Sequence, residues 1–288
     1  TTWDFASFGM ATFDITALAS GPAGIVYAGT NGAASPGGGG ACTIYRSRGN
    51  ANLWTCVDPV TDSVSVTSLL VDASGGVHAG GFRHVFTSLD EGDTWSARAV
   101  APTTIGALAQ TAAGAMLAGT TGAGVYINTP SETAWKPWQQ GLFAPIRDLL
   151  VVPGKAIAAT EGGIFYTSDQ GLTWQRFVEN QPLLLDTRKL ALDSEGVWRL
   201  SEPVTTGAEL LPATWEFLGP AAGLRIGALS AGPDGRIWVG YHSGVQYMSA
   251  NGSWTVMPIQ GDDGAFRDVS AIGVMDDGSL IAGAAWDS

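Results

Sequence analysis

The sequence has few basic residues and no long apolar run. Its 288 residues include 14 Lys and Arg against 26 Asp and Glu, a formal net charge of −12, and only three of the basic residues are Lys. Because phosphate binding needs clustered Lys and Arg, this balance argues against a nucleic-acid partner. No stretch approaches the ~18 uninterrupted apolar residues of a transmembrane helix, so we do not expect a membrane-spanning protein.

Cysteine and histidine are also scarce. Cys42 and Cys56 are the only cysteines, which excludes a scaffold of several disulfides and a cysteine-based zinc cluster. The three histidines, His78, His84 and His242, show no metal-ligand spacing, so we expect core or surface positions for them. The sequence therefore predicts neither a metal nor another cofactor.

What the sequence does contain is a repeat marked by tryptophan and small residues. Seven tryptophans are separated by 51 residues in the first interval and by 39 to 41 residues in each later one: Trp3, Trp54, Trp95, Trp135, Trp174, Trp215 and Trp254. A second ladder is a small step, usually Ala-Gly, at residues 27–29, 78–80, 117–119, 157–159, 238–240 and 281–283. Two ladders in phase indicate a structural unit of about 40 residues.

Each repeat has the same order of segments. An apolar run such as 105–109 precedes a turn and the small step, and a glycine turn, a β-branched and aromatic run such as 163–166, a polar turn and the Trp follow. Four short strands per repeat predict an all-β protein, and no segment has a convincing helical period. Seven such units predict a seven-bladed β-propeller of four-stranded antiparallel blades, since stacked blades cover each other's faces. We expect a single domain over residues 1–288, with a Gly-rich loop insert at 31–41 in the first blade.

Two of the polar turns share a motif. Residues 88–95 read SLDEGDTW and match S-x-D-x-G-x-T-W in full, and residues 167–174 read TSDQGLTW, with Thr in the first place. The motif resembles the Asp-box, or BNR repeat, of a propeller superfamily that includes sialidases, xyloglucan-hydrolysing propellers, sortilin-type receptors and photosystem II assembly factors. The resemblance implies the architecture and leaves the activity open.

The residues of both boxes are expected to be structural. The Asp side chain can accept hydrogen bonds within its own hairpin, the Gly supplies a turn with positive φ, and the Trp fills the gap between sheets. A calcium-binding or catalytic role for the aspartates is the alternative. The residues concerned are Ser88, Asp90, Gly92 and Trp95 in the first box, and Thr167, Asp169, Gly171 and Trp174 in the second.

The last blade is expected to be closed by both termini. Trp3 fits the tryptophan ladder as part of an outer strand, while residues 269–274 and 279–284 supply two inner strands of the same blade. One strand of this blade has no counterpart in the sequence. We predict either that the native polypeptide extends before Thr1 and carries the missing strand, or that a partner donates it by β-augmentation.

Four arginines lie near the starts of expected inner strands, where ligand contacts of a propeller are expected. They are Arg147, Arg188, Arg225 and Arg267. Because guanidinium groups bind carboxylates through two parallel hydrogen bonds, the four arginines predict an anion-binding mouth of the central channel. Asp148 and Asp268 each follow one of these arginines and support the alternative, in which the arginines form structural ion pairs.

The two cysteines fall near the start of the third strand and within the fourth strand of the first blade, so Cys42 and Cys56 could face each other across a hairpin. A disulfide would indicate an oxidising compartment and would slightly favour an extracytoplasmic location. The alternative is a pair of small core residues.

The sequence favours a non-catalytic recognition or assembly propeller that binds a protein, or a glycan, through one face. Flanking domains of a longer polypeptide are further candidate partners. The competing class is a sialidase-like glycoside hydrolase, although the sialidase F-R-I-P motif has only a distant counterpart at 82–85 and no Tyr–Glu nucleophile pair is identifiable. A deep pocket with two carboxylates ~5–10 Å apart would favour the hydrolase. A flat or filled face would favour binding.

Overall fold

The computed structural model describes most of the first six-tenths of the chain and shorter segments of the remainder. The described residues are 6–11, 14–32, 42–49, 51, 53–58, 65–138, 142, 145–152, 155–160, 163–168, 173–176, 190–192, 198–200, 215–217, 226–231, 237–241, 244–248, 254–259, 268–275 and 279–285. In this part of the chain the regular structure is β, apart from a single 3-10 turn, η1 (Pro22–Gly24). It contains no helix long and apolar enough to cross a membrane.

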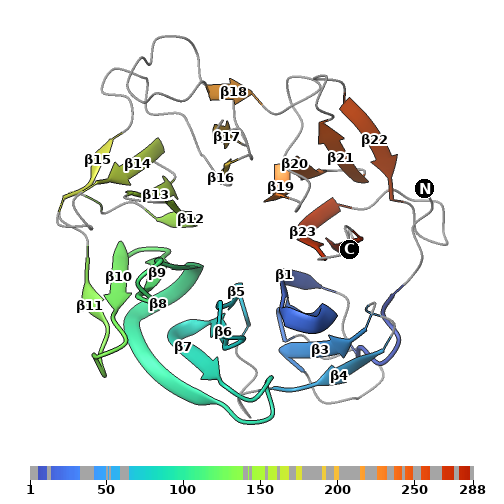
Figure 1. Ribbon diagram of the computed structural model, residues 1–288, viewed down its shortest axis with the longest axis horizontal. Coiled ribbons are helices and arrows are strands. Elements are labelled where there is room, and N and C mark those ends of the chain that lie inside the picture. The colour runs from blue at the N-terminus through green and yellow to red at the C-terminus, as the bar shows by residue number, and fades with distance from the viewer. Residues whose placement is uncertain are drawn as a thin grey trace.

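The strands form blades around a central axis, with one strand of each blade innermost (Figure 1). The first blade contains β1 (Ile15–Ser20), β2 (Ile25–Thr30), β3 (Ile44–Arg48) and β4 (Trp54–Cys56). The second contains β5 (Ser68–Val71), β6 (Val77–Gly80), β7 (Phe82–Ser88) and the first part of β8 (Ser96–Gln110). The third contains the second part of β8, β9 (Met116–Thr120), β10 (Val125–Asn128) and β11 (Lys136–Pro137).

The remaining strands continue the ring. The fourth blade contains β12 (Ile146–Val152), β13 (Lys155–Thr160), β14 (Gly163–Thr167) and β15 (Gln175–Arg176). The fifth contains β16 (Leu190–Leu192), β17 (Trp198–Leu200) and β18 (Trp215–Phe217). The sixth contains β19 (Ile226–Ala231), β20 (Ile237–Tyr241), β21 (Gly244–Met248) and β22 (Trp254–Pro258), and the seventh contains β23 (Asp268–Val274) and β24 (Leu280–Ala285). The predicted all-β propeller is confirmed, and these sheets are consistent with seven blades.

Two sheets differ from a set of separate antiparallel blades. The long strand β8 is the outer strand of the second blade and the inner strand of the third, so these blades form one seven-stranded sheet. In the fifth blade β17 and β18 pair in parallel. In an up-and-down blade the second and fourth strands run in the same direction. Here the second strand, β17, pairs directly with the Trp-bearing strand, β18, so the two strands are parallel.

The small-residue ladder exists because neighbouring blades approach each other closely. A Cβ atom built on Gly119 would lie 2.4 Å from the Ile146 side chain of the next blade, and one on Gly240 would lie 2.5 Å from Val269. Similar approaches occur at Gly29, Gly80 and Gly283. A larger residue at these positions would push the blades apart, so the ladder marks the blade–blade contact.

The first and last blades meet and close the ring. The hydroxyl of Ser270 in β23 donates to the carbonyl of Ile15 in β1 at 2.6 Å. At the outer rim, the Nε1 of Trp54 donates to the carbonyl of Ala6 at 2.6 Å. Two other ladder tryptophans donate in the same way to a residue three positions after the preceding ladder tryptophan: Trp95 to Val57 and Trp174 to Trp138.

Ala6 therefore occupies the position that belongs, in other blades, to the residue just after the outer strand. This placement is consistent with a last blade closed by both termini. Trp3, the ladder residue three positions before Ala6, lies outside the described residues.

Candidate functional site

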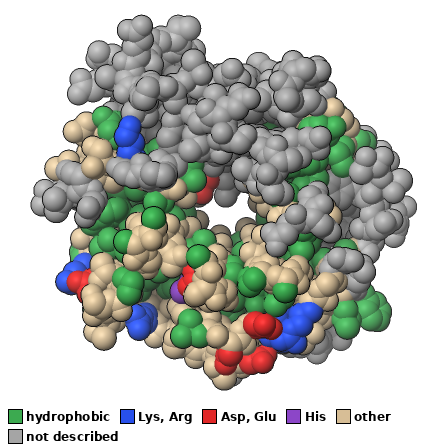
Figure 2. All heavy atoms as spheres, viewed as in Figure 1, with side chains coloured by type: hydrophobic (Ala, Val, Ile, Leu, Met, Phe, Trp, Pro, Cys, Tyr) green, Lys and Arg blue, Asp and Glu red, His purple; other side chains and the backbone are tan. Residues whose placement is uncertain are grey.

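The ring has two ends, which we name by what they carry. Each inner strand begins at the connector face, which also carries the turn between the second and third strands, such as Gly81 between β6 and β7. The Asp-box face carries the turns between the first and second strands and between the third and fourth strands, including residues 89–95. Figure 2 shows an opening at the centre of the ring.

The first box is held together by hydrogen bonds among its own residues. The hydroxyl of Ser88 donates to Asp90 Oδ1 at 2.8 Å and accepts from the Gly92 amide at 2.7 Å. The other end of the turn binds the same carboxylate, because Thr94 donates its amide to Oδ1 at 2.8 Å and its hydroxyl to Oδ2 at 2.6 Å. Gly92 has φ +96°, which favours glycine.

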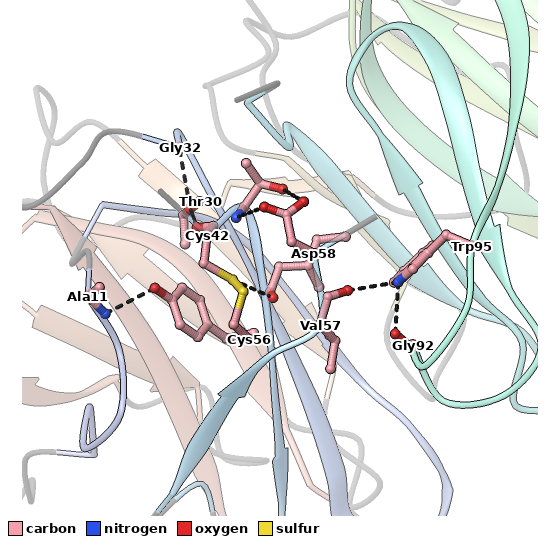
Figure 3. Close-up of a disulfide and its surroundings, with 12 residues drawn as sticks. Ala11, Thr30, Gly32, Cys42, Cys56, Val57, Asp58, Gly92 and Trp95 are labelled. Carbon is pink, nitrogen blue, oxygen red and sulfur yellow. Dashed lines mark hydrogen bonds between the residues drawn. A yellow bond between two sulfur atoms is a disulfide. The ribbon is translucent and has the colours of Figure 1, made fainter. Parts of the chain in front are cut away.

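The hydrogen bonds to Asp90 stabilise its charged form. The Thr94 side chain is the largest cause that lowers the pKa of Asp90, followed by the Thr94 amide and the Ser88 hydroxyl, and the pKa falls to about 2. The box Trp95 donates its Nε1 to Val57 of the preceding blade at 2.7 Å and to Gly92 at 2.9 Å (Figure 3). These contacts fasten a hairpin and hold it to its neighbour.

The second box is described in part. Thr167 and Trp174 are buried, and the Trp174 Nε1 donates to the Trp138 carbonyl at 2.9 Å. Asp169 and Gly171 lie outside the described residues. The structural role of these two residues remains a prediction.

The predicted arginine site is described at only one of its four positions. Arg147 is exposed in β12, and the adjacent Asp148 is half-buried and accepts the Leu149 amide through Oδ1 at 3.0 Å. Arg188, Arg225 and Arg267 lie outside the described residues, and of Asp268 only the backbone, in β23, is described. The anion-binding mouth therefore stays a prediction.

The strand register shows that the two Arg-Asp pairs are not equivalent. Asp148 pairs with Ala159, and at the same rung of the last blade Ala271 pairs with Gly283. Asp268 lies three residues before that rung. Asp148 and Asp268, which look equivalent in the sequence, therefore occupy different positions along their inner strands.

Inner strands carry a bulge next to this rung, and the bulge residue contacts the next blade. The bulge residues Ser270 and Thr16 donate to the carbonyls of Ile15 and Val66. At the corresponding place just before β5, Thr67 donates to the Ile105 carbonyl at 2.6 Å. In the third blade the bulge residue is Gly106, whose Cβ would lie 2.5 Å from the Ile146 carbonyl. Arg147 occupies this position in the fourth blade. Among the described residues at this position, Thr16, Thr67, Gly106 and Ser270 are small and join neighbouring blades.

Cys42 and Cys56 form a disulfide with an S–S distance of 2.06 Å and a Cα–Cα distance of 6.0 Å (Figure 3). Beside it, Asp58 accepts the Thr43 amide at 3.1 Å and the Thr43 hydroxyl at 2.8 Å. Both features lie where the Gly-rich insert at 31–41 rejoins the first blade. Although the sulfurs and Asp58 lie close together, the bonded sulfurs cannot act as thiolate ligands, so the cluster is not a metal site.

His78 is a buried and satisfied histidine. Its Nε2 lies 3.0 Å from Asp72 Oδ2 and its Nδ1 lies 3.0 Å from the Thr87 hydroxyl. Burial tends to raise the pKa of Asp72, but the hydrogen bonds from His78, Ser74 and Gly76 outweigh it and lower the pKa to about 2. At the matching rung the third blade carries buried Leu117, so His78 occupies a core position of the repeat.

The sequence pattern did not single out the residues at the start of β7, which follow the turn at Gly81. Phe82 is 53% exposed, although large apolar side chains are usually buried. Arg83 has φ +68° and its guanidinium carbon lies 6.0 Å from the Phe82 ring centroid. The sequence alone could have pointed to these residues. Residues 82–84 read FRH, whereas the neighbouring repeats have glycines in this connection.

No model of a known protein family matches the sequence, and no curated protein sequence matches it. Solved structures do match the fold. One is a streptogramin B lyase, with a TM-score of 0.77 and 12% identity over 97% of this chain and 93% of that chain. Another is YCF48 bound to a D1 peptide, with 0.69 and 14% over 98% and 95%. A third is the WD40 β-propeller domain of Doa1, with 0.66 and 14% over 97% and 94%. These likenesses show the fold alone.

Proposed function

We propose that this chain is a non-catalytic β-propeller of the Asp-box type that binds a segment of a protein partner through its connector face. The observation that carries the proposal is the exposed pair of Phe82 and Arg83 on that face. An exposed aromatic ring beside an exposed guanidinium is the combination that protein-binding surfaces favour. The Asp-box face instead uses its polar groups within its own turns, as Ser88 and Asp90 show.

Phe82 and Arg83 belong to a continuous surface that spans the second and third blades. Phe82 pairs with Thr104, whose carbonyl accepts the Thr121 amide at 3.0 Å. The hydroxyls of Thr103 and Thr121 lie 3.0 Å apart. We call this surface the turn patch, and it consists of Phe82, Arg83, Thr103, Thr104, Thr121 and Gly122.

The likeness to YCF48 supports a peptide-binding role for this fold. That structure contains a bound D1 peptide, and the two chains cover each other almost completely. The Cys42–Cys56 disulfide supports an oxidising compartment, in which the partner would also be found. The motif S-x-D-x-G-x-T-W and its internal hydrogen bonds support the Asp-box assignment.

The hydrolase alternative receives less support from the described residues. Glycoside hydrolysis needs two carboxylates at a controlled separation. Among the side chains that the structure describes, the carboxylates at the starts of inner strands are Asp14 and Asp148. They belong to the first and fourth blades, on different sides of the ring (Figure 1), and Asp14 accepts a hydrogen bond from Asn31 at 2.6 Å.

The proposal is tested by blocking each face separately. Peptides that bind the protein are first selected from a random heptapeptide phage library. Gly122→Trp adds bulk to the turn patch, where a new Cβ would meet only the Thr103 hydroxyl at 3.7 Å. The matched control is Leu89→Trp on the Asp-box face, since Leu89 is 82% exposed.

We expect Gly122→Trp to abolish binding of the selected peptides and Leu89→Trp to leave it unchanged. Peptides lost with Leu89→Trp, or with neither variant, would show that the connector face is not the binding face. A parallel screen on immobilised glycans tests the other class of partner. Glycan binding at the turn patch without peptide binding would overturn the protein-partner proposal.

A further inference from the structure

The repeat allows the turn between the second and third strands to be compared among blades. The pairs Val85–Gly80, Val125–Gly119 and Val245–Gly240 place equivalent residues at the same rung. The residue before the valine is Gly124 in the third blade and Gly244 in the sixth, with φ +73° and +147°. In the second blade that residue is His84, and Arg83 before it takes the left-handed conformation at φ +68°.

The left-handed conformation is unfavourable for arginine. A residue with a Cβ is strained in this region, whereas glycine adopts it readily. In the third and sixth blades the positive-φ residue of this connection is a glycine, Gly124 or Gly244, one position further along than Arg83. Residues held in rare backbone conformations often belong to functional sites. Arg83 is therefore a candidate for recognition rather than for folding.

Within the described residues, no carboxylate pairs with the guanidinium of Arg83, and the same holds for Arg98, whose Nη1 donates to Asn128 Oδ1 at 3.2 Å, whereas several other basic side chains are paired. Arg46 pairs with Asp93 at 2.9 Å, Arg48 pairs with Glu91 at 2.6 Å, and Lys136 pairs with Glu132. The guanidinium of Arg83 instead lies over the ring of Phe82. In a chain with a net charge of −12, this guanidinium is an exposed cation that the surrounding acids leave unpaired.

The backbone of the turn is held in place before any ligand arrives. The Gly81 amide donates to the His84 carbonyl at 3.1 Å, and the Ile105 amide donates to the Gly81 carbonyl at 3.0 Å. These bonds anchor the turn to its own blade and to the start of the next inner strand. Because the backbone is already ordered, binding of a ligand here loses little backbone entropy, and this favours affinity.

We propose, on the basis of the binding function argued above, that Arg83 and Phe82 recognise a carboxylate-bearing peptide segment. The guanidinium donates two N–H groups to the carboxylate, and the ring of Phe82 packs against a neighbouring apolar side chain of the peptide. The carboxylate belongs to an Asp or Glu side chain or to a peptide C-terminus.

The composition of the turn patch favours a peptide over a neutral sugar. The patch offers a cation, an aromatic ring and threonine hydroxyls, and none of its residues is an acid or an amide. Recognition of a sugar depends on acceptors that receive several hydroxyl protons, and carboxylates and amides are the main side chains that supply them. The surface matches one negative charge beside an apolar group.

The test compares Arg83→Gly with the wild-type protein, with peptides selected from the heptapeptide library as probes. Arg83→Gly removes the guanidinium and places at φ +68° a residue that adopts this conformation readily, so the variant should fold at least as well as the wild type. We expect acidic residues beside an apolar residue in the selected peptides. We also expect Arg83→Gly to raise their Kd roughly 10- to 100-fold, the effect of losing a charge-assisted hydrogen-bonded pair.

The matched control is Ala23→Gly on the Asp-box face, because Ala23 is exposed and also has a positive φ of +57°. It relieves similar backbone strain and should leave peptide binding unchanged. Arg83→Lys keeps the charge but not the paired N–H groups, and should bind with intermediate affinity. Peptides without an acid, or equal affinity for Arg83→Gly and wild type, would overturn the inference.

The two proposals fail in different ways. Loss of binding with Gly122→Trp but not with Arg83→Gly would leave the connector face as the binding face and remove Arg83 from it. Loss of peptide binding in Leu89→Trp would show that the connector face is not the binding face. A selection that enriches no peptide would overturn both proposals. Binding of sialylated glycans that depends on Arg83, with no acidic peptide bound, would overturn the peptide as the ligand.

Discussion

The two ends of strand β7 carry turns of opposite character. At one end Ser88, Asp90 and Thr94 exchange hydrogen bonds with one another and with the backbone. At the other end Phe82 and Arg83 are exposed, and within the described residues no carboxylate pairs with Arg83. The first turn also holds a residue in the left-handed region, Glu91 at φ +58°, but its hydrogen bonds stabilise the blade. In the second turn Arg83 keeps an unfavourable backbone conformation, and its exposed side chain does not stabilise the blade. This difference distinguishes a turn that holds the fold together from a candidate binding element.

The largest expected difference concerns the aromatic residues of the two turns. Trp95 packs against the core between the first two blades and donates two hydrogen bonds, so we expect Trp95→Ala to lower the free energy of unfolding by about 3 kcal/mol. Phe82→Ala should change it by less than about 0.5 kcal/mol. Urea denaturation of both variants checks the contrast. Equal losses would mean that both turns hold the fold.

The next effect concerns a hydroxyl at each end. Ser88 is buried and its Oγ accepts the Gly92 amide, so Ser88→Ala leaves a buried amide without its partner and should cost about 2 kcal/mol. Thr121→Ala removes a hydroxyl that is hydrogen-bonded to the Thr103 hydroxyl, and should cost less than about 1 kcal/mol. Thermal unfolding of the pair would contradict this expectation if Thr121→Ala proved the more harmful.

The pH dependence of stability should reveal the Asp90 hydrogen bonds. The pKa of Asp90 is lowered to about 2 from an ordinary value of 3.8, so the folded state favours the charged carboxylate. Its contribution is therefore fully present above about pH 4–5 and is lost as the pH falls toward 2. Exposure to solvent keeps this effect smaller than the loss of Trp95.

Asp90→Asn removes this titration and should flatten the fall of the melting temperature between pH 5 and pH 2. Asp72, whose pKa also falls to about 2, continues to titrate in that variant. A slope identical to that of the wild-type protein would mean that the charge of Asp90 does not stabilise the turn.

The smallest effect has the opposite sign. Arg83→Gly relieves the left-handed conformation at φ +68° and should stabilise the protein by up to about 1 kcal/mol, after the larger entropy of glycine in the unfolded chain is subtracted. Ala23→Gly should shift stability in the same direction. Differential scanning calorimetry measures both. A clear loss of stability in Arg83→Gly would show that the guanidinium supports the fold, against the recognition role.

Much of the fold was predictable because each repeat has to solve the same packing problem. Gly119 and Gly240 recur at one position since the next blade leaves no room for a Cβ. Trp95 and Trp174 recur since each donates to the blade before it. The arginine site was less predictable, because a three-residue offset in strand register separates Asp148 from its apparent counterpart Asp268. Register of this kind depends on pairing between strands, which a list of residues does not contain.

The sequence by itself determined the all-β class, the period of about 40 residues and the self-contained Asp-box turn, because these follow from local chemistry repeated along the chain. Only the tertiary structure decided which residues share a surface. It brought Phe82 beside Thr104 and Thr121 of the next blade, joined Cys42 to Cys56, and placed Ser270 against Ile15 across almost the whole chain. Contacts between blades are set by strand register and by the closing of the ring, and both arise only when all the blades are packed together.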